Sequence, residues 1–291
     1  MAAITAAQVK SLRDETGLPM MECKTALTEA NGSPEEAKAL LQKKYKGKME
    51  SRASNVTGEG RIALHFADDR KTGAIIDLRC ETAPVAKTEQ FLALAATIAE
   101  TVFAQDDPNL GKEASLALPA VGHDGKTIGE LIADVFGILR ENLNLECCRK
   151  LTGGYLCGYV HHDGKTGVLV ALNAPPNPES VGVDLCHHLT FANPLAIDRS
   201  GIPADDIAKV ETLSREVAEG DGKPPHIVDK IVEGKVNAFC AENALMEQEH
   251  VKIPKNKVGD VLKEAGGETF ETLIVSATEV DQASGRLRGR R

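Results

Sequence analysis

The chain has 291 residues, of which 42% are hydrophobic and only 3% aromatic, and its formal net charge at pH 7 is −9. This length and apolar content suffice for two or more compact units whose cores consist of Ala, Leu, Ile and Val. The acidic balance argues against broad nucleic-acid binding, which requires a basic face, so we expect no direct contact with nucleic acid.

The amino-terminal segment and the most apolar segment show no pattern of export or membrane insertion. The first residues, MAAITAAQ, lack the charged start and apolar stretch of a signal peptide. Residues 91–104 are the most apolar segment, but they are too short to span a bilayer and include Glu100. The seven cysteines form no CxxC pair and are expected to be reduced. These features predict a soluble cytoplasmic protein that does not bind membranes.

Residues 1–45 predict a small module of three short helices. Thr5, Pro19 and Ser33 are each placed to begin a helix, through a side-chain cap or a proline at an early position. Three short helices make a marginal core, so the module depends on tight packing. The basic and polar segment that follows, residues 46–57, is interpreted as a solvated linker with some helical character.

Two similar stretches predict a repeated β-hairpin. DRKTGAIIDL, at residues 69–78, aligns without gaps with DGKTGVLVAL, at residues 163–172. Each follows an alternating strand pattern and precedes a helical pattern. We therefore predict an α+β fold in which two copies of a β-β-α unit, residues 58–150 and 151–280, form one duplicated core.

The remaining elements follow from caps and periodicity. A helix is predicted over residues 127–142, where Thr127 is followed three positions later by the Glu of a capping box. Residues 204–241 predict two helices joined by a short turn, an antiparallel helical hairpin inserted into the second copy. A last strand is predicted over residues 269–277, and the basic tail, residues 281–291, is expected to be disordered.

Some segments resemble motifs for nucleotide binding or serine acylation, but neither motif is complete. Two GKT segments, AVGHDGKT and YVHHDGKT, lack the first glycine of a nucleotide-binding P-loop and are better explained as turns. Lys-Thr-Gly occurs twice, but the chain has no S-x-x-K to supply an acylating serine. These two motifs are therefore rejected.

A metal site is also not expected. His161, His162 and Asp163 form one cluster of ligand types, and Cys186 to His188 form another. Adjacent residues of a strand or helix point to different faces, so at most one side chain from each cluster converges. We expect no metal and no other cofactor.

Two features have the character of contact sites. Met20 and Met21 are adjacent in a predicted helix, so at least one faces outward as a flexible apolar contact, with core packing as the alternative. Residues 81–85 connect a strand to a helix, a common position for functional loops, yet they contain no nucleophile, no glycine and no ligand cluster.

Five segments in fixed order resemble the elongation factor Ts family, and together they extend over nearly the whole chain. They are LRDETGLPMMECKTAL (12–27), NVTGEGRI (55–62), DLRCETAPVAKTEQF (77–91), GKPPHIVDKIVEGKVNAF (222–239) and VGDVLKEAG (258–266). The resemblance implies an amino-terminal module like the ubiquitin-associated domain, a duplicated core and a helical-hairpin insertion.

The resemblance also implies a function, that of guanine-nucleotide exchange factor for elongation factor Tu. Such a factor binds the GDP form, displaces Mg²⁺ and phosphate contacts, and lets GDP leave so that GTP can bind. A partner that prefers the nucleotide-free state weakens GDP binding by linkage, without covalent chemistry, so the resemblance implies that the protein is not an enzyme. Alternatives are a non-exchanging or chaperone-like partner of elongation factor Tu and a binder of ubiquitin-like or nascent chains. A homodimer through the helical hairpin is left open.

The resemblance implies that residues 82–85 form the loop that dislocates Mg²⁺. This chain has Thr82, Ala83, Pro84 and Val85 where the family usually has Thr-Asp-Phe-Val. The acid and the aromatic ring are both replaced. Proline is a smaller and stiffer apolar body, which we expect to act as a rigid wedge.

Other partner contacts are implied position by position. In the amino-terminal module they are Arg13, Met20 and Met21. In the core they are Leu139 and Arg140, which stand where the family has an Ile-Gly pair, and His161 and His188. Each of these histidines has a histidine neighbour, so the position is ambiguous by one residue.

Overall fold

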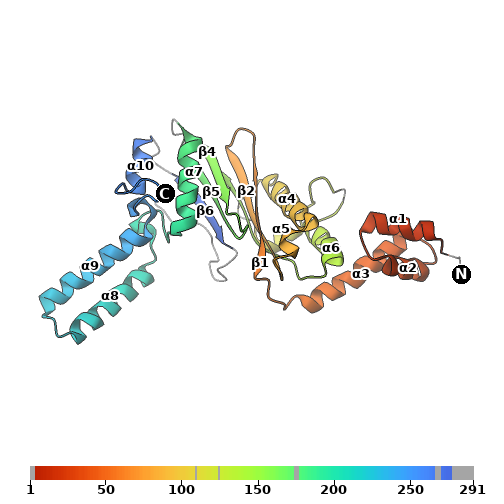
Figure 1. The fold of residues 1–291 in the computed structure, drawn as a ribbon, viewed down its shortest axis with the longest axis horizontal. Helices are drawn as coiled ribbons and strands as arrows, with labels where there is room; N and C mark the ends of the chain where they lie inside the picture. Colours follow the sequence, from red (N-terminus) through yellow and green to blue (C-terminus); the bar gives the residue numbers. More distant parts are fainter. Residues whose placement is uncertain (1–3, 109, 124, 174–176, 266–269, 277–291) are drawn as a thin grey trace. The chain divides into compact units, whose positions relative to one another are not determined.

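The computed structural model describes residues 4–108, 110–123, 125–173, 177–265 and 270–276, and it mixes helices with strands (Figure 1). The predicted α+β class is confirmed. The chain divides into two compact units. The first comprises Met1–His65 and Ala74–Lys150, and the second comprises Phe66–Gly73 and Leu151–Arg291. None of the described helices combines the length and the apolar character needed to cross a membrane.

The first unit begins with three helices, α1 (Ala6–Thr16), α2 (Met20–Glu29) and α3 (Pro34–Arg52). Thr5 caps α1 by accepting a hydrogen bond from the Gln8 backbone, and Ser33 caps α3 in the same way. These predicted caps are confirmed.

Helix α3 is longer than predicted and includes residues 46–52 of the expected linker. Tyr45 is buried and Met49 is partly buried against the helical module, in line with Leu41 at a spacing of four residues. This apolar stripe extends the helix, because each added turn buries one more side chain. The predicted linker is therefore corrected to residues 53–58.

The first sheet has the strand order β1-β2-β3 among the described residues, with β1 at Glu59–Phe66, β2 at Thr72–Cys80 and β3 at Asn144–Thr152. Helices α4 (Glu89–Phe103), α5 (Lys112–Leu116) and α6 (Ile128–Leu139) follow β2 in the chain. Side chains of β2, α4, α6 and β3 share one core, which includes Phe91, Ile98 and Ile128. Strand β2 is buried along almost its whole length because it is the central strand.

Two elements of this unit were not predicted. Strand β3 has an irregular burial pattern and contains charged residues, so it lacks the alternation by which a half-buried strand is recognised. Helix α5 is only five residues long. The helix predicted from Thr127 forms with its capping box but ends at Leu139, three residues early, where Arg140 turns left-handed.

The second unit contains an antiparallel sheet of order β4-β5-β6, with β4 at Tyr155–Val160, β5 at Thr166–Leu172 and β6 at Phe270–Ser276. Helix α7 (Pro178–Ala192) packs on β4 and β5. The ends of the strand predicted over 269–277, and the tail at 281–291, lie outside the described residues. Both units thus pair a hairpin with a later third strand.

The predicted helical hairpin is present in the second unit. Helices α8 (Ala204–Gly220) and α9 (Pro225–Asn243) lie side by side (Figure 1). Ala218 packs with Val228 and Val232 near the turn, and Arg215 forms an ion pair with Asp229. Helix α10 (Val258–Glu264) follows the hairpin.

Candidate functional site

The segment between β2 and α4 forms a compact, ordered loop. Pro84 has φ −58° and ψ −43° and precedes a short 3-10 turn, η1 (Val85–Lys87). The Ala86 N–H donates to the Thr82 carbonyl at 3.3 Å, and Lys87 donates to the Pro84 carbonyl at 3.2 Å. The side chains of Thr82 and Pro84 are exposed, whereas those of Ala83 and Val85 are half-buried. The loop therefore presents Pro84 to solvent on a hydrogen-bonded turn.

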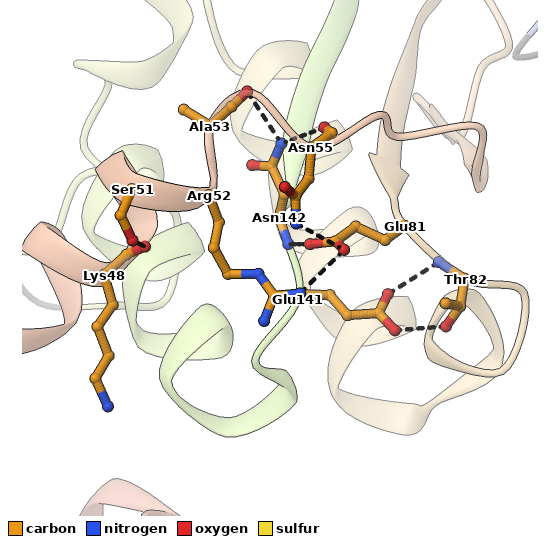
Figure 2. Close-up of polar contacts among 9 residues, drawn as sticks. All are labelled: Lys48, Ser51, Arg52, Ala53, Asn55, Glu81, Thr82, Glu141 and Asn142. Atoms are coloured by element: carbon orange, nitrogen blue, oxygen red, sulfur yellow. Dashed lines mark hydrogen bonds and ion pairs between the residues drawn. The ribbon is translucent and has the colours of Figure 1, made fainter.

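A carboxylate from beyond α6 anchors the start of this loop. Glu141 accepts the Thr82 N–H at Oε2 over 2.9 Å and the Thr82 hydroxyl at Oε1 over 2.5 Å (Figure 2). Both oxygens of one carboxylate are thus used by a single loop residue. Hydrogen bonds to an ionised acceptor are stronger than neutral ones, so this contact restrains Thr82.

A second set of contacts holds the neighbouring Glu81. Its carboxylate accepts the Asn142 N–H at 2.6 Å, the Asn55 amide at 3.0 Å and the Arg52 guanidinium at 3.1 Å (Figure 2). The Asn142 amide in turn donates to the Asn55 carbonyl at 3.0 Å and the Ala53 carbonyl at 3.4 Å.

The protonation of Glu81 reflects these contacts. Burial acts to raise its pKa, but the hydrogen bonds from Asn142, Asn55 and Arg52 and the charge of Arg52 lower it below the ordinary value. Glu81 is therefore an anion at neutral pH, and it ties the loop to the end of α3. Near that end of α3 the Ser51 hydroxyl donates to the Lys48 carbonyl at 2.7 Å (Figure 2).

The amino-terminal contact residues lie on the helical module. Met20 and Met21 are 51% and 68% exposed, so neither fills the module's core. Arg13 is half-buried on α1 and forms an ion pair with Asp14 at 2.8 Å. The alternative of core packing for the methionines is therefore excluded, while their contact with a partner stays a prediction.

Arg140 connects the helical module to α6. It adopts φ +64°, a left-handed conformation that costs a side-chain-bearing residue about 1 kcal/mol or more. Its guanidinium donates to Glu22 Oε1 at 2.8 Å and to the Tyr45 hydroxyl at 2.7 Å, and it lies 4.6 Å from the Tyr45 ring centroid. The Tyr45 hydroxyl donates to Glu22. Leu139, next to Arg140, packs half-buried against the core of the first unit.

The charge of Glu22 depends on this arrangement. Burial acts to raise the pKa of Glu22, but hydrogen bonds from Tyr45 and Arg140, with the charges of Arg140 and Lys44, lower it to about 2. For Tyr45, burial and then the hydrogen bond to Glu22 raise the pKa. At neutral pH the cluster therefore consists of a carboxylate, a neutral phenol and a guanidinium.

The two adjacent histidines of α7 separate into an inner member, His188, and an outer member, His187. His188 is 1% exposed. Its Nδ1 accepts the Val251 N–H at 3.3 Å, so Nε2 donates to Gln248 Oε1 at 2.9 Å. Burial lowers the pKa of His188, the nearby His250 lowers it further, and the bond to Gln248 opposes this. His188 is therefore a neutral interior histidine.

Two partly exposed histidines, one from each pair, meet at one tyrosine, and His162 is the more exposed member of its own pair. His161 is half-buried, and its Nδ1 lies 3.2 Å from the Tyr159 hydroxyl. The His187 ring lies 4.6 Å from the Tyr159 ring, and its Nδ1 lies 3.0 Å from the Lys252 ammonium. The structure thus brings His161 and His187 to one partly exposed aromatic surface, with His188 behind it.

The contacts that hold the site together carried no sequence signal. Glu141 contacts Thr82, which lies 59 positions earlier in the chain, and Asn142 contacts Glu81, which lies 61 positions earlier. Arg140 contacts Glu22, which lies 118 positions earlier. Short-range patterns of capping and periodicity do not report on such pairs. In the part of the chain that the structure describes, no three His, Cys, Asp or Glu residues are grouped so as to hold a metal ion.

Comparison with known proteins gives consistent results. The family described as "Elongation factor TS" matches residues 81–279. The elongation factor Ts of Aquifex aeolicus (strain VF5) is 39% identical over 271 residues, covering 91% of this chain and 93% of that protein. The elongation factor Ts of Bordetella petrii is 40% identical over 265 residues, with coverage of 91% and 88%. That of Chlorobium phaeobacteroides (strain BS1) is 35% identical over 268 residues, with coverage of 91% and 93%.

Proposed function

This chain belongs to the elongation factor Ts family of translation elongation factors, and on that basis we propose that it is a guanine-nucleotide exchange factor for elongation factor Tu. It binds the GDP form, displaces the contacts to Mg²⁺ and phosphate, and stabilises the nucleotide-free form until GTP binds. The thermodynamics require only that it prefers the empty partner to the filled one, since that preference weakens GDP binding by the same factor. It therefore acts as a binding protein and not as an enzyme, and it needs no cofactor.

The anchored loop is the observation that supports this proposal most directly. Thr82 is held by both oxygens of Glu141, and Pro84 is exposed on the turn that follows. A loop that already has its bound conformation loses little entropy on binding, so more of the interaction energy is available to act on the partner. Ala83 has no acidic side chain, so we assign the disruption of the Mg²⁺ site to the steric bulk of Pro84 and to the turn itself.

Further contacts complete the proposed partner surface. The helical module, residues 1–45, presents Met20 and Met21 with Arg13 near them in the sequence, and we propose that it binds the partner separately from the loop. Leu139 and Arg140 follow at the end of α6. Because the Arg140 guanidinium is hydrogen-bonded to Glu22 and Tyr45 of the module, we propose that Arg140 positions the module and does not contact the partner directly.

In the second core copy, residues 151–280, we propose that the partner meets the two histidines beside Tyr159. His161 and His187 are partly exposed beside Tyr159, whereas His188 is buried and hydrogen-bonded on both ring nitrogens. His188 then keeps α7 and the 248–251 segment together beneath the contact surface. We place this activity in the cytoplasm, where translation takes place. We also propose that the exposed Leu213 and Val217 of α8 offer an apolar face for a homodimer.

The function is tested by the release of fluorescently labelled GDP from the cognate elongation factor Tu. We expect saturating protein to accelerate release roughly 10-fold or more, within the range of ordinary coupling energies. Affinity for the nucleotide-free partner should exceed affinity for the GDP form by the factor by which the protein weakens GDP binding at equilibrium. Binding without acceleration would support the non-exchanging alternative, and equal affinities for the two forms would contradict exchange by linkage.

The wedge is tested by Pro84→Gly. Glycine adds backbone freedom worth about 0.4–1 kcal/mol, so maximal GDP release should slow about 2- to 5-fold while affinity for the partner changes less. The matched control is Pro224→Gly, which loosens an exposed proline at the start of α9 and should leave release unchanged. Equal losses of rate and affinity at Pro84 would mean that the loop contributes only to docking.

A further inference from the structure

Three consecutive residues after α6 each hold a different part of the first unit. Arg140 binds Glu22 of α2 and Tyr45 of α3. The next residue, Glu141, binds Thr82 through both carboxylate oxygens. The third, Asn142, donates its N–H to Glu81 and its amide to the carbonyls at 53 and 55.

This arrangement ties two distant surfaces to one short piece of backbone. Glu22 directly follows Met20 and Met21, and Thr82 directly precedes Ala83 and Pro84. Consecutive Cα atoms are about 3.8 Å apart across a trans peptide, so the anchors of the two surfaces cannot separate unless one set of contacts breaks. The contacts involve charged partners, which makes them the stronger kind of hydrogen bond.

We propose that residues 140–142 act as a splint that holds the Thr82–Val85 loop and the start of α2 in one fixed geometry, so that both reach the partner together. This inference rests on the proposed function and assigns positioning residues within it. When two contact points are held at the correct spacing, binding at the first brings the second close to its site on the partner. The second contact then forms at a high effective concentration, which raises the overall affinity.

Substitutions at two residues can distinguish the positioning role of the splint from a direct contact with the partner. Tyr45 is 3% exposed, and its polar contacts run to Glu22 and Arg140, so a partner cannot reach it. Glu141 is half-exposed, but a glutamine there preserves the geometry without the charge. Its amide oxygen accepts the Thr82 N–H and its amide group donates to the Thr82 hydroxyl.

The first measurement uses the free protein and is independent of exchange activity. Amide hydrogen exchange at Thr82 should accelerate about 10-fold or more in Glu141→Ala and by a clearly smaller factor in Glu141→Gln, because exchange reports local opening and the glutamine keeps neutral hydrogen bonds to Thr82. Tyr45→Phe should also accelerate it, by about 2- to 5-fold, although Tyr45 belongs to the other end of the splint. The control is Glu113→Ala, an exposed carboxylate on α5. An unchanged Thr82 amide in Tyr45→Phe would overturn the splint.

The second measurement uses GDP release from elongation factor Tu by the full-length variants. Glu141→Ala should reduce the maximal release rate roughly 5- to 10-fold, with Glu141→Gln restoring most of it. If the two ends share one function, the double variant Tyr45→Phe with Glu141→Ala should be no slower than the slower single variant, since coupled residues are not additive.

Outcomes for the splint and for the proposed function are distinct. If the losses of maximal release rate in the two single variants multiply in the double variant, the two surfaces act separately, which overturns the splint. If Glu141→Ala and Glu141→Gln lose the same release rate, the charge of Glu141 touches the partner, which also overturns the splint. A wild-type protein that does not accelerate GDP release contradicts the proposed function alone, because the amide-exchange result stands without a partner.

Discussion

Replacing Phe136 with alanine is expected to lower the free energy of unfolding of the first unit by about 3–5 kcal/mol, the range found for buried aromatic residues cut back to alanine. Phe136 belongs to α6 but is 1% exposed and packs in the core of the helical module, together with Leu12, Leu27 and Leu41. The three amino-terminal helices are too small to form a substantial core by themselves. The aromatic ring of α6 supplies the volume that this core lacks.

The measurement is urea denaturation followed by circular dichroism, with the midpoint and slope compared to the wild-type protein. Phe191→Ala is the matched control, because Phe191 is 79% exposed on α7 and the same substitution there should change the free energy by about 0.5 kcal/mol or less. Similar midpoints for the two variants would show that α6 does not support the module.

The loss at Phe136 should also affect function. A loosened helical module no longer holds Met20 and Met21 at a fixed distance from the Thr82–Val85 loop. We expect Phe136→Ala to weaken binding to elongation factor Tu at temperatures where the second unit is still folded. This links the packing of one aromatic ring to the two-point contact proposed above.

The second large effect is expected at Gly182, where alanine should destabilise the second unit by about 2 kcal/mol or more. A Cβ atom at Gly182 would lie 2.0 Å from Cys157 Sγ and 2.7 Å from Cys157 Cβ. Helix α7 therefore rests directly on strand β4, and a methyl group there forces the two apart. Alanine favours a helix over glycine by about 1 kcal/mol, but this gain is smaller than the cost of such an overlap.

Gly234→Ala provides the control with the opposite sign. Gly234 lies within α9, and a Cβ added there meets no atom within 4 Å. The substitution should therefore stabilise the protein by about 0.5–1 kcal/mol. Combining Gly182→Ala with Cys157→Gly removes the obstructing atoms and should restore part of the loss. A denaturation midpoint of Gly182→Ala equal to or above that of the wild-type protein would contradict the close approach.

The displacement of α7 in Gly182→Ala should also disturb the proposed contact surface. Helix α7 also carries His187 and His188, whose positions beside Tyr159 and Gln248 depend on how the helix lies on the sheet. A displaced α7 would move the outer histidine and break the interior hydrogen bond. Weaker binding to elongation factor Tu should therefore accompany the loss of stability.

Local features of this chain were predictable from its residues. Thr5, Ser33 and Thr127 cap helices because their side chains bond a backbone N–H within three positions, which a short stretch of sequence already contains. The repeated DGKTG-type hairpin and the helical hairpin followed from patterns of the same short range. The likeness to the elongation factor Ts family, which rests on ordered blocks of sequence, was confirmed by comparison.

Only the tertiary structure decided which residues meet across elements. Whether His187 or His188 lies inside depends on how α7 is rotated against the sheet, and two adjacent histidines look alike in the sequence. The contacts of residues 140–142 join elements separated by dozens of positions, and no local pattern marks them. Capping and periodicity are set by neighbours within about one turn, whereas packing selects partners by shape and charge after distant segments meet. The sequence therefore determined the capped helices, the hairpins and the family, and the packing determined how the loop is held.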